Sequence, residues 1–326
     1  MSDAIAVSVI TPVYNVEPYL RQCLDSLCAQ DLPNIEFVCV NDGSTDGSAA
    51  ILREYAQRDA RIRVIDKPNS GYGATMNRGL AEARGEYVGI VESDDFAEPT
   101  MFRELYRAAK KRDCDLVKCN YFEYYDGADH VLRNFGRLMC GRRFDPADKP
   151  QIIRTIPAIW TGLYRRSMLV EQKVNFRETP GASFQDTGFT LKAWFAAHSC
   201  VLLRKPLLHY RMDNPGSSSV SISEKPFTVV DELASAEAFL RTMPDRAARF
   251  LPWFHADKLG KYRWCYERIP AESKERFAEI MRDEYAAAKA AGELNCALLT
   301  QEEQAVLREL LAATPEEFAR AHAVGF

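Results

Sequence analysis

The sequence lacks an apolar run that could cross a bilayer. A membrane-spanning helix needs roughly 20 apolar residues in succession, and the 326-residue chain contains no such stretch. Its first residues, Met1–Ile10, contain no basic segment of the kind that opens a secretory signal. We therefore expect a cytoplasmic protein, with action at the inner face of the membrane as an alternative.

The cysteines lack the spacing of a zinc site or a disulfide scaffold. They are odd in number, nine in all, and are scattered along the chain. Cys23 and Cys28 are separated by four residues, not by the two residues of a zinc-binding pair. Cys39 lies inside an apolar run, which indicates a reduced core residue and fits a reducing compartment.

The chain also lacks an excess of positive charge. Its formal net charge is −4, so it has no overall basic field, and we expect no nucleic-acid partner. The 47% of hydrophobic and 27% of charged residues are ordinary for a globular protein. The length suits one large domain or a domain with an appendage.

The usual glycine-rich phosphate-binding motifs are missing as well. No Gly-x-Gly-x-x-Gly follows the first apolar strand, and no Gly-x-x-x-x-Gly-Lys-Ser/Thr occurs anywhere. Gly71-Tyr72-Gly73 is a weak glycine signal, which we interpret as the entry to a helix. The pattern therefore excludes the common dinucleotide and P-loop phosphate cradles.

The first part of the chain does contain a regular alternation of strands and helices. Short apolar or β-branched runs predict strands at 7–11, 35–40, 61–65, 87–91 and 116–120. Segments of helical period follow the first four of them. Such alternation predicts an α/β fold, with a Rossmann-like, mostly parallel sheet and helices on both faces.

The chain beyond residue 225 has a different character. Helical patterns predict a C-terminal helical appendage over 227–241, 244–268, 271–291 and 300–312. We therefore predict two domains, residues 1–224 and residues 225–326. The helix over 244–268 is basic and aromatic. We expect its rings to pack on the first domain, with peripheral contact to a membrane or an anionic acceptor as the alternative.

Polar clusters follow three of the predicted strands. They are Pro12–Asn15, Asn41–Ser48 and Glu92–Asp95. Because the carboxyl ends of parallel strands meet at one edge of a sheet, we expect a ligand site there. The carboxylates of the third cluster repel one another unless a cation lies among them, and oxygen ligands suit Mg²⁺ or Mn²⁺. The alternative is a solvated acidic turn that caps the next helix.

Three segments closely resemble glycosyltransferase family 2 in order, spacing and strand context. They are Val7–Asn15, Asn41–Ser48 and Gly85–Asp95. A weaker resemblance, to members that build polysaccharides and lipopolysaccharides, runs from Phe184–Asp186 to His209–Arg211. The resemblance implies a GT-A fold, a nucleotide-sugar donor, a Mn²⁺ or Mg²⁺ cofactor and inversion at the anomeric carbon.

The resemblance also implies roles for residues of the donor site. Asp95 is expected to bind the metal, and Asp94 to hold the donor ribose or assist the metal. Asp42 corresponds to the aspartate that accepts a hydrogen bond from uracil in similar enzymes, with a turn aspartate as the alternative. The pocket for the base is expected to be walled by Pro12, Tyr14 and Asn15.

Further roles are implied nearer the end of the first domain. Asp186 matches the base that removes the acceptor proton, with a helix N-cap as the alternative. His209 could complete the metal shell and Arg211 could pair with the diphosphate, or both could be structural. The chain departs from many relatives at Glu92 and Gln185, where those have Asp and Glu.

These assignments predict an inverting, metal-dependent glycosyltransferase of the hexosyltransferase type. It would move one sugar from a nucleotide-sugar, with a UDP-sugar favoured, to a hydroxyl of a cell-surface glycan or a lipid-linked saccharide. A sugar nucleotidyltransferase is a weaker alternative, because it would carry a glycine-rich basic signature where this chain has Pro12–Asn15. A non-catalytic nucleotide-sugar-binding module is the other alternative, and it would not need Asp94, Asp95 and Asp186.

Overall fold

The chain forms two compact units in the computed structural model, which describes residues 4–214, 225–323 and 325. The first unit comprises Met1–Pro146 and Thr155–Gly216, and the second comprises Ala147–Arg154 and Ser217–Phe326. The domain boundary predicted between residues 224 and 225 stays a prediction, because residues 215–224 lie outside the described part of the chain. The stretch Met212–Ser223, whose Asn, Pro, Gly and Ser residues predict a loop, also lies mostly outside the described residues.

One mixed sheet organises the first unit. Its strands are β1 (Val7–Val13), β2 (Ile35–Asn41), β3 (Ile62–Asp66), β4 (Tyr87–Ile90), β5 (Phe96–Ala97), β6 (Leu116–Tyr125), β7 (Ala128–Leu132), β8 (Gly162–Arg165) and β9 (Cys200–Arg211). They follow the order β3-β2-β1-β4-β8-β6-β9-β5, with β7 paired to β6. The first four strands are parallel, as predicted, and antiparallel pairs enter at β8. The predicted α/β class is confirmed, with antiparallel strands beyond β4.

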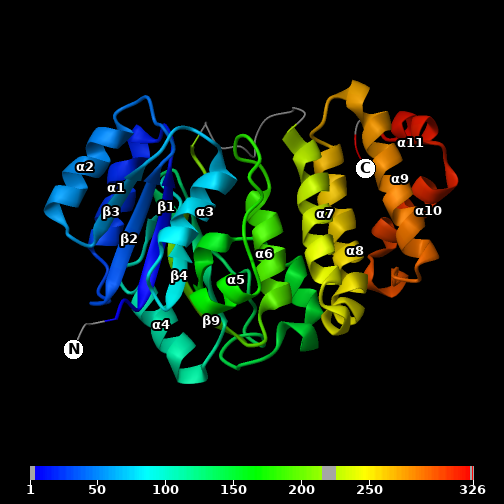
Figure 1. Cartoon of the computed structure of the whole chain (residues 1–326). Helices are drawn as coiled ribbons and strands as arrows, with labels where there is room; N and C mark the ends of the chain where they lie inside the picture. The colour runs from blue at the N-terminus through cyan, green and yellow to red at the C-terminus, as the bar shows by residue number, and fades with distance from the viewer. Residues whose placement is uncertain (1–3, 215–224, 324, 326) are drawn as a thin grey trace. The chain divides into compact units, whose positions relative to one another are not determined.

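Helices cover both faces of this sheet (Figure 1). They are α1 (Glu17–Cys28), α2 (Ser48–Arg58), α3 (Tyr72–Glu82), α4 (Met101–Arg112), α5 (Arg166–Glu171) and α6 (Gln185–Ala196). The chain moves from β1 to β2 to β3 in one direction along the sheet and then returns from β3 to β4. Because crossovers between parallel strands are right-handed, this reversal places α1 and α2 on one face and α3 on the other. Since β1, β2 and β4 are parallel, their carboxyl ends share the edge where the polar clusters begin.

The second unit is helical, as the sequence predicts. It contains α7 (Thr228–Arg241), α8 (Pro244–Tyr266), α9 (Lys274–Ala290), α10 (Gln301–Ala312) and α11 (Pro315–Ala321). The last of these is missing from the sequence prediction, although Thr314 and Glu317 form a capping box around Pro315. In α8, Phe250, Phe254 and Tyr262 are buried. Among the described residues, no helix is both long and apolar enough to cross a membrane.

A buried carboxylate ties the amino-terminal ends of the parallel strands together. Glu36 on β2 is 3% exposed, and it accepts a hydrogen bond from the Ser8 hydroxyl of β1 at 2.6 Å. The guanidinium groups of Arg63 on β3 and Arg84 also donate to it, at 3.0 Å and 2.5 Å. Burial raises the pKa of Glu36, but the hydrogen bonds from Arg84, Ser8 and Arg63 outweigh burial and lower it to about 2.

Replacing Glu36 by Gln is expected to lower the free energy of unfolding at neutral pH by about 2–3 kcal/mol. The folded-state pKa lies below the unfolded value of about 4.3. The contribution is therefore complete above about pH 5 and is lost as the pH falls toward 2. Urea unfolding of both proteins near pH 7 and near pH 2.5 measures this difference.

The matched control is Glu171→Gln, which changes an exposed glutamate at the end of α5. It should leave the free energy of unfolding within about 0.5 kcal/mol of the original protein. An effect of Glu36→Gln that is equally large at both pH values would contradict the electrostatic account.

Candidate functional site

The loops that follow β1 and β2 are joined by hydrogen bonds. Asn15 has a left-handed backbone with φ of 48°, and its amide donates to the Ser44 hydroxyl at 3.1 Å. The Asn15 side-chain oxygen accepts from the Thr45 amide at 2.8 Å. Pro12 is buried in β1 opposite Val40. The structure thus brings the first two polar clusters together, and Tyr14 stands beside them with 52% of its surface exposed.

Asp42 links the end of β2 to the connection that leads into α3. Its carboxylate forms an ion pair with Lys67 and accepts from the backbone amides of Ser70 at 2.9 Å and Gly71 at 3.1 Å. These partners lie 25 to 29 residues away, so Asp42 does not act as a local turn residue. A carboxylate has about four acceptor positions, so Asp42 retains capacity for a ligand donor.

The acidic turn after β4 contains a buried carboxylate oxygen without a partner. Asp95 is 1% exposed; its Oδ1 accepts from the Arg211 amide at 2.9 Å, while its Oδ2 has no hydrogen bond in the described chain. Burial raises the pKa of Asp95 well above its usual range, and the charges of Asp94 and Glu92 add to this effect. Neither aspartate caps α4, whose N-cap is Thr100.

This donor set fits a hard divalent cation. A buried oxygen with no hydrogen-bond donor, next to further carboxylates, is stabilised by a positive charge placed against it. Carboxylate oxygens are the ligands that Mg²⁺ and Mn²⁺ prefer. Asp95 would hold such an ion, with Asp94 beside it. The Asp94 Oδ2 accepts a hydrogen bond from the Asn214 side-chain nitrogen Nδ2 at 2.8 Å.

Arg211 at the end of β9 holds the acidic turn in place. Its side chain is 8% exposed, and its Nε donates to the backbone oxygen of Asp94 at 2.9 Å. One terminal nitrogen contacts Gln22, and the guanidinium lies over the rings of Tyr19 and Tyr124, 4.9 Å and 5.1 Å from their centroids. Pairing with a diphosphate would require some of these contacts to be exchanged. That role stays a prediction, and the contacts favour the structural alternative.

His209, two residues earlier on β9, already has partners at both ring nitrogens. Nδ1 lies 2.7 Å from an oxygen of Asp129, and Nε2 lies 2.9 Å from an oxygen of Glu98. The imidazole stacks on Phe96 and Phe122, with centroid distances of 4.3 Å and 4.7 Å. A metal could bind His209 only by displacing one carboxylate. The metal role stays a prediction, and the contacts favour a structural histidine.

Asp186 occupies the first turn of α6. The N-cap of this helix is Phe184, whose φ is 61°, so the capping alternative for Asp186 does not match the helix boundary. The Asp186 Oδ1 accepts from the Thr187 amide at 2.7 Å. Gln185 is 2% exposed, and its Nε2 donates to the Thr179 hydroxyl at 2.8 Å. The backbone before Asp186 is thereby held in a sparsely populated conformation, as is common at functional sites.

Helix α3 holds the segment that leads to Asp186. The Asn77 side chain exchanges two hydrogen bonds with the Phe176 backbone, each of 3.0 Å. The Tyr72 amide donates to the Gly181 oxygen at 3.0 Å. A Cβ on Gly73 would lie 1.8 Å from the Arg177 oxygen, so only glycine allows this approach.

Tyr72 also connects this segment to the acidic turn. Its hydroxyl donates to Glu92 Oε1 at 2.6 Å. Burial raises the pKa of Glu92 to about 8. The charges of Asp94 and Asp186 also raise this pKa, whereas the hydrogen bond from Tyr72 lowers it. Asp186 therefore lies within electrostatic reach of the turn. The role of Tyr72 is absent from the sequence prediction, and the Gly71-Tyr72-Gly73 motif was its signal.

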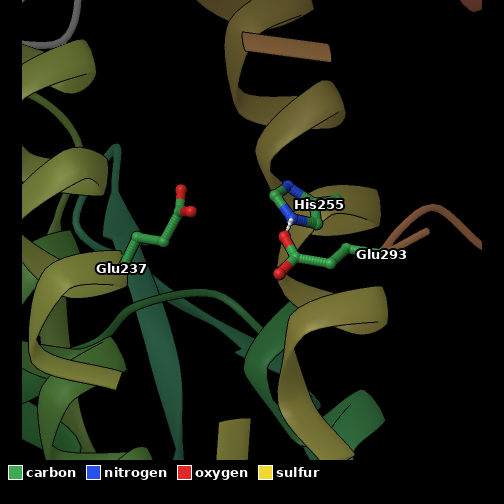
Figure 2. Close-up of side chains that lie close together, drawn as sticks. All are labelled: Glu237, His255 and Glu293. Carbon is green, nitrogen blue, oxygen red and sulfur yellow. Dashed lines mark hydrogen bonds and ion pairs between the residues drawn. The ribbon is translucent and has the colours of Figure 1, made fainter. Parts of the chain in front are cut away.

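A second group of candidate metal ligands lies in the other unit. Glu237, His255 and Glu293 offer ligand atoms within 4.8 Å of one another (Figure 2). Arg241 binds both carboxylates at 2.7 Å, and Lys258 lies 3.5 Å from Glu237. Burial lowers the pKa of His255. Because two cations already balance this group, it is an ion-pair network that joins α7 to α8 and to the residues after α9.

Comparisons with known proteins place the chain in a family. The model of Glycosyl transferase family 2 matches residues 8–173. The putative glycosyltransferase EpsH of Bacillus subtilis is 36% identical over 214 residues, which is 64% of this chain and 61% of that protein. Glycosyltransferase GlyA of Streptococcus pneumoniae is 30% identical over 247 residues, 73% of this chain and 35% of that protein. The chain thus spans about three fifths of EpsH and about one third of GlyA.

A solved structure shows the same fold. Staphylococcus aureus TarS 1-349 in complex with UDP aligns with a TM-score of 0.65 and 21% identity, over 98% of this chain and 90% of that one. This likeness shows the fold. The chain belongs to glycosyl transferase family 2 and has the GT-A fold, so the predicted membership in a family of enzymes is confirmed.

Replacing Asp95 by Asn is expected to raise the melting temperature of the metal-free protein at neutral pH. The change removes a buried charge worth about 1–3 kcal/mol of destabilisation, and the Asn oxygen can still accept from the Arg211 amide. The same variant should lose any stabilisation by Mn²⁺. Thermal unfolding with and without Mn²⁺ measures both effects.

Asp126→Asn is the control, because Asp126 is exposed in the turn between β6 and β7 and its positive φ suits Asn. It should change neither melting temperature nor response to Mn²⁺. A lower melting temperature of metal-free Asp95→Asn would show that the Asp95 carboxylate does not destabilise the metal-free protein.

Proposed function

We propose that this protein is an inverting, metal-dependent glycosyltransferase of the hexosyltransferase type, which uses a nucleotide-sugar donor and most naturally a UDP-sugar. One observation carries the proposal: in a family 2 chain, the buried Asp95 oxygen without a partner lies at the sheet edge that also holds Asp42. The TarS structures with UDP and with UDP-GlcNAc support a UDP-sugar. The mannosyltransferase PcManGT from Pyrobaculum calidifontis, which has a similar fold with a TM-score of 0.53 and 16% identity, was solved in complex with GDP-Man and Mn²⁺.

The donor site is proposed at the loops that follow β1, β2 and β4. Asp42 accepts a hydrogen bond from the base, and Asp94 holds the ribose. Asp95 binds Mg²⁺ or Mn²⁺, with His209 as a further candidate ligand. When bound, the ion would neutralise charge that develops on the diphosphate leaving group. The base pocket is walled by Pro12, Tyr14 and Asn15.

Asp186 is proposed as the general base. It takes the proton from the acceptor hydroxyl while the oxygen attacks the anomeric carbon on the face opposite the leaving diphosphate. This displacement inverts the anomeric configuration. The hydrogen bonds of Tyr72 and Asn77 support Asp186 in this role by fixing the segment before α6, and Arg211 supports the turn that holds the donor.

The acceptor is proposed to be a cell-surface glycan or a lipid-linked saccharide. The poly(ribitol-phosphate) beta-glucosyltransferase of Bacillus spizizenii, which is 36% identical over 195 residues, is named for transfer to a polymer and supports a polymeric acceptor. We propose that transfer takes place in the cytoplasm or at the inner face of the membrane. Residues 1–224 are proposed to form the transferase domain, and residues 225–326 a separate helical region.

A nucleotide panel tests the donor site. UDP with Mn²⁺ is expected to raise the melting temperature more than UDP or Mn²⁺ alone, and more than GDP, CMP or dTDP with Mn²⁺. The reason is that the base contact of Asp42 and the metal contact of Asp95 act on one ligand. If no nucleotide gives a metal-dependent shift, the donor-site assignment fails and the non-catalytic binding module is favoured.

Replacing Asp186 by Asn is expected to lower kcat by at least about 100-fold, because Asn cannot accept the acceptor proton. The Kd for UDP should stay within about threefold, since the Asn oxygen can keep the hydrogen bond from the Thr187 amide. Turnover of a UDP-sugar and isothermal titration with UDP give the two values. Asp126→Asn serves again as control, and retained turnover in Asp186→Asn would rule out this base.

A further inference from the structure

One flank of the first unit carries exposed cations that no acidic side chain neutralises. They are Arg107 and Lys111 on α4, Arg137 and Arg142 in the segment after β7, and Arg204 on β9. All five are exposed, and none forms an ion pair with any described residue. We call these five residues the basic face.

The segments that carry the basic face are joined to one another. The amide of Gly141, next to Arg142, donates to the Leu202 oxygen of β9 at 2.9 Å. The neighbouring Leu203 lines a surface hollow of about 660 Å³ together with Arg107 and Lys111 of α4. The cations on α4, on β9 and on the segment after β7 therefore belong to one continuous surface.

The acidic side chains beside this surface already have cationic partners. Glu104 pairs with Lys205 at 2.6 Å, and Glu86 pairs with Lys110 at 2.8 Å. Asp113 is bound by Arg165. The basic face is thus a local excess of positive charge on a chain whose net charge is −4.

An exposed apolar side chain lies in the segment that carries Arg137 and Arg142. Leu138 lies between Arg137 and Arg142 in the chain, and 97% of its surface is exposed. An exposed leucine side chain contributes no burial energy to the fold, whereas its transfer from water to an apolar phase is favourable in free energy. An apolar tip flanked by cations is the arrangement that binds at the interface of an anionic bilayer.

We propose that the basic face docks on an anionic lipid bilayer, with Leu138 inserted below the headgroups. A single-stranded nucleic acid is the less suitable partner, because such sites offer exposed aromatic rings for stacking, and the exposed tip here is a leucine. The proposal does not depend on the proposed function.

Binding of the full chain to lipid vesicles tests the proposal. We expect sedimentation with vesicles of phosphatidylglycerol and phosphatidylcholine but not with phosphatidylcholine alone, and weaker binding at high salt. The triple variant R107E/K111E/R142E should bind on the order of 100-fold more weakly. The control K173E/K289E/R308E makes the same change of net charge at exposed lysines and arginines elsewhere, and it should bind like the original protein.

A second variant tests the insertion of Leu138. Leu138→Ser should weaken vesicle binding about tenfold and leave the melting temperature unchanged, because the side chain is exposed. The proposal is overturned if the original protein does not bind anionic vesicles, or if the triple variant and its control bind equally. It is also overturned if an oligonucleotide binds as tightly as the vesicles and Leu138→Ser has no effect.

Discussion

The buried charge of Asp95 is the constraint around which the first unit is arranged. Three carboxylates follow β4 within four residues, and such a turn repels itself. Arg211 offsets part of that repulsion with its backbone amide and its guanidinium, although it lies 116 residues further along the chain. The strands β6 and β9 deliver Arg211 to this place. One oxygen of Asp95 is left without a hydrogen-bond partner, and that oxygen is where we propose that a cation binds.

The rest of the site edge is held by the same kind of long-range bond. Asn15 fixes the first loop against the second, and Asp42 fixes the second against the start of α3. Tyr72 then joins α3 to Glu92 and to the segment before Asp186. The bonds of Asp42 and Tyr72 satisfy polar groups that burial would otherwise penalise, whereas those of Asn15 are exposed. The loops are therefore positioned by side chains of other loops, which explains how elements far apart in the sequence form one site.

Sequence patterns predicted β1 to β4 and their helices because hydrophobic period is a local property. They could not predict how β6, β8 and β9 pair. Strand β8 lies between β4 and β6 and is antiparallel to both, and its partner residues lie more than 40 positions away in the sequence. The same reason explains His209, whose partners lie 80 and 111 residues away. The family resemblance suggested a place in the metal shell, which stays a prediction. The two carboxylates and the two aromatic rings around its imidazole come from distant parts of the chain. The unpartnered oxygen of Asp95 was also beyond prediction, since burial depends on the whole fold.

The two departures from the family pattern, Glu92 and Gln185, are explained by the contacts of this chain. Gln185 donates a hydrogen bond to the Thr179 hydroxyl, which a carboxylate could only accept. A glutamate there would also add a buried charge beside Asp186, whose charge already acts on Glu92. Glu92 in turn needs the Tyr72 hydroxyl as a donor. A neutral residue 185 and a tyrosine at position 72 therefore limit the electrostatic repulsion around Asp186 and leave its carboxylate as the one negative group at the start of α6.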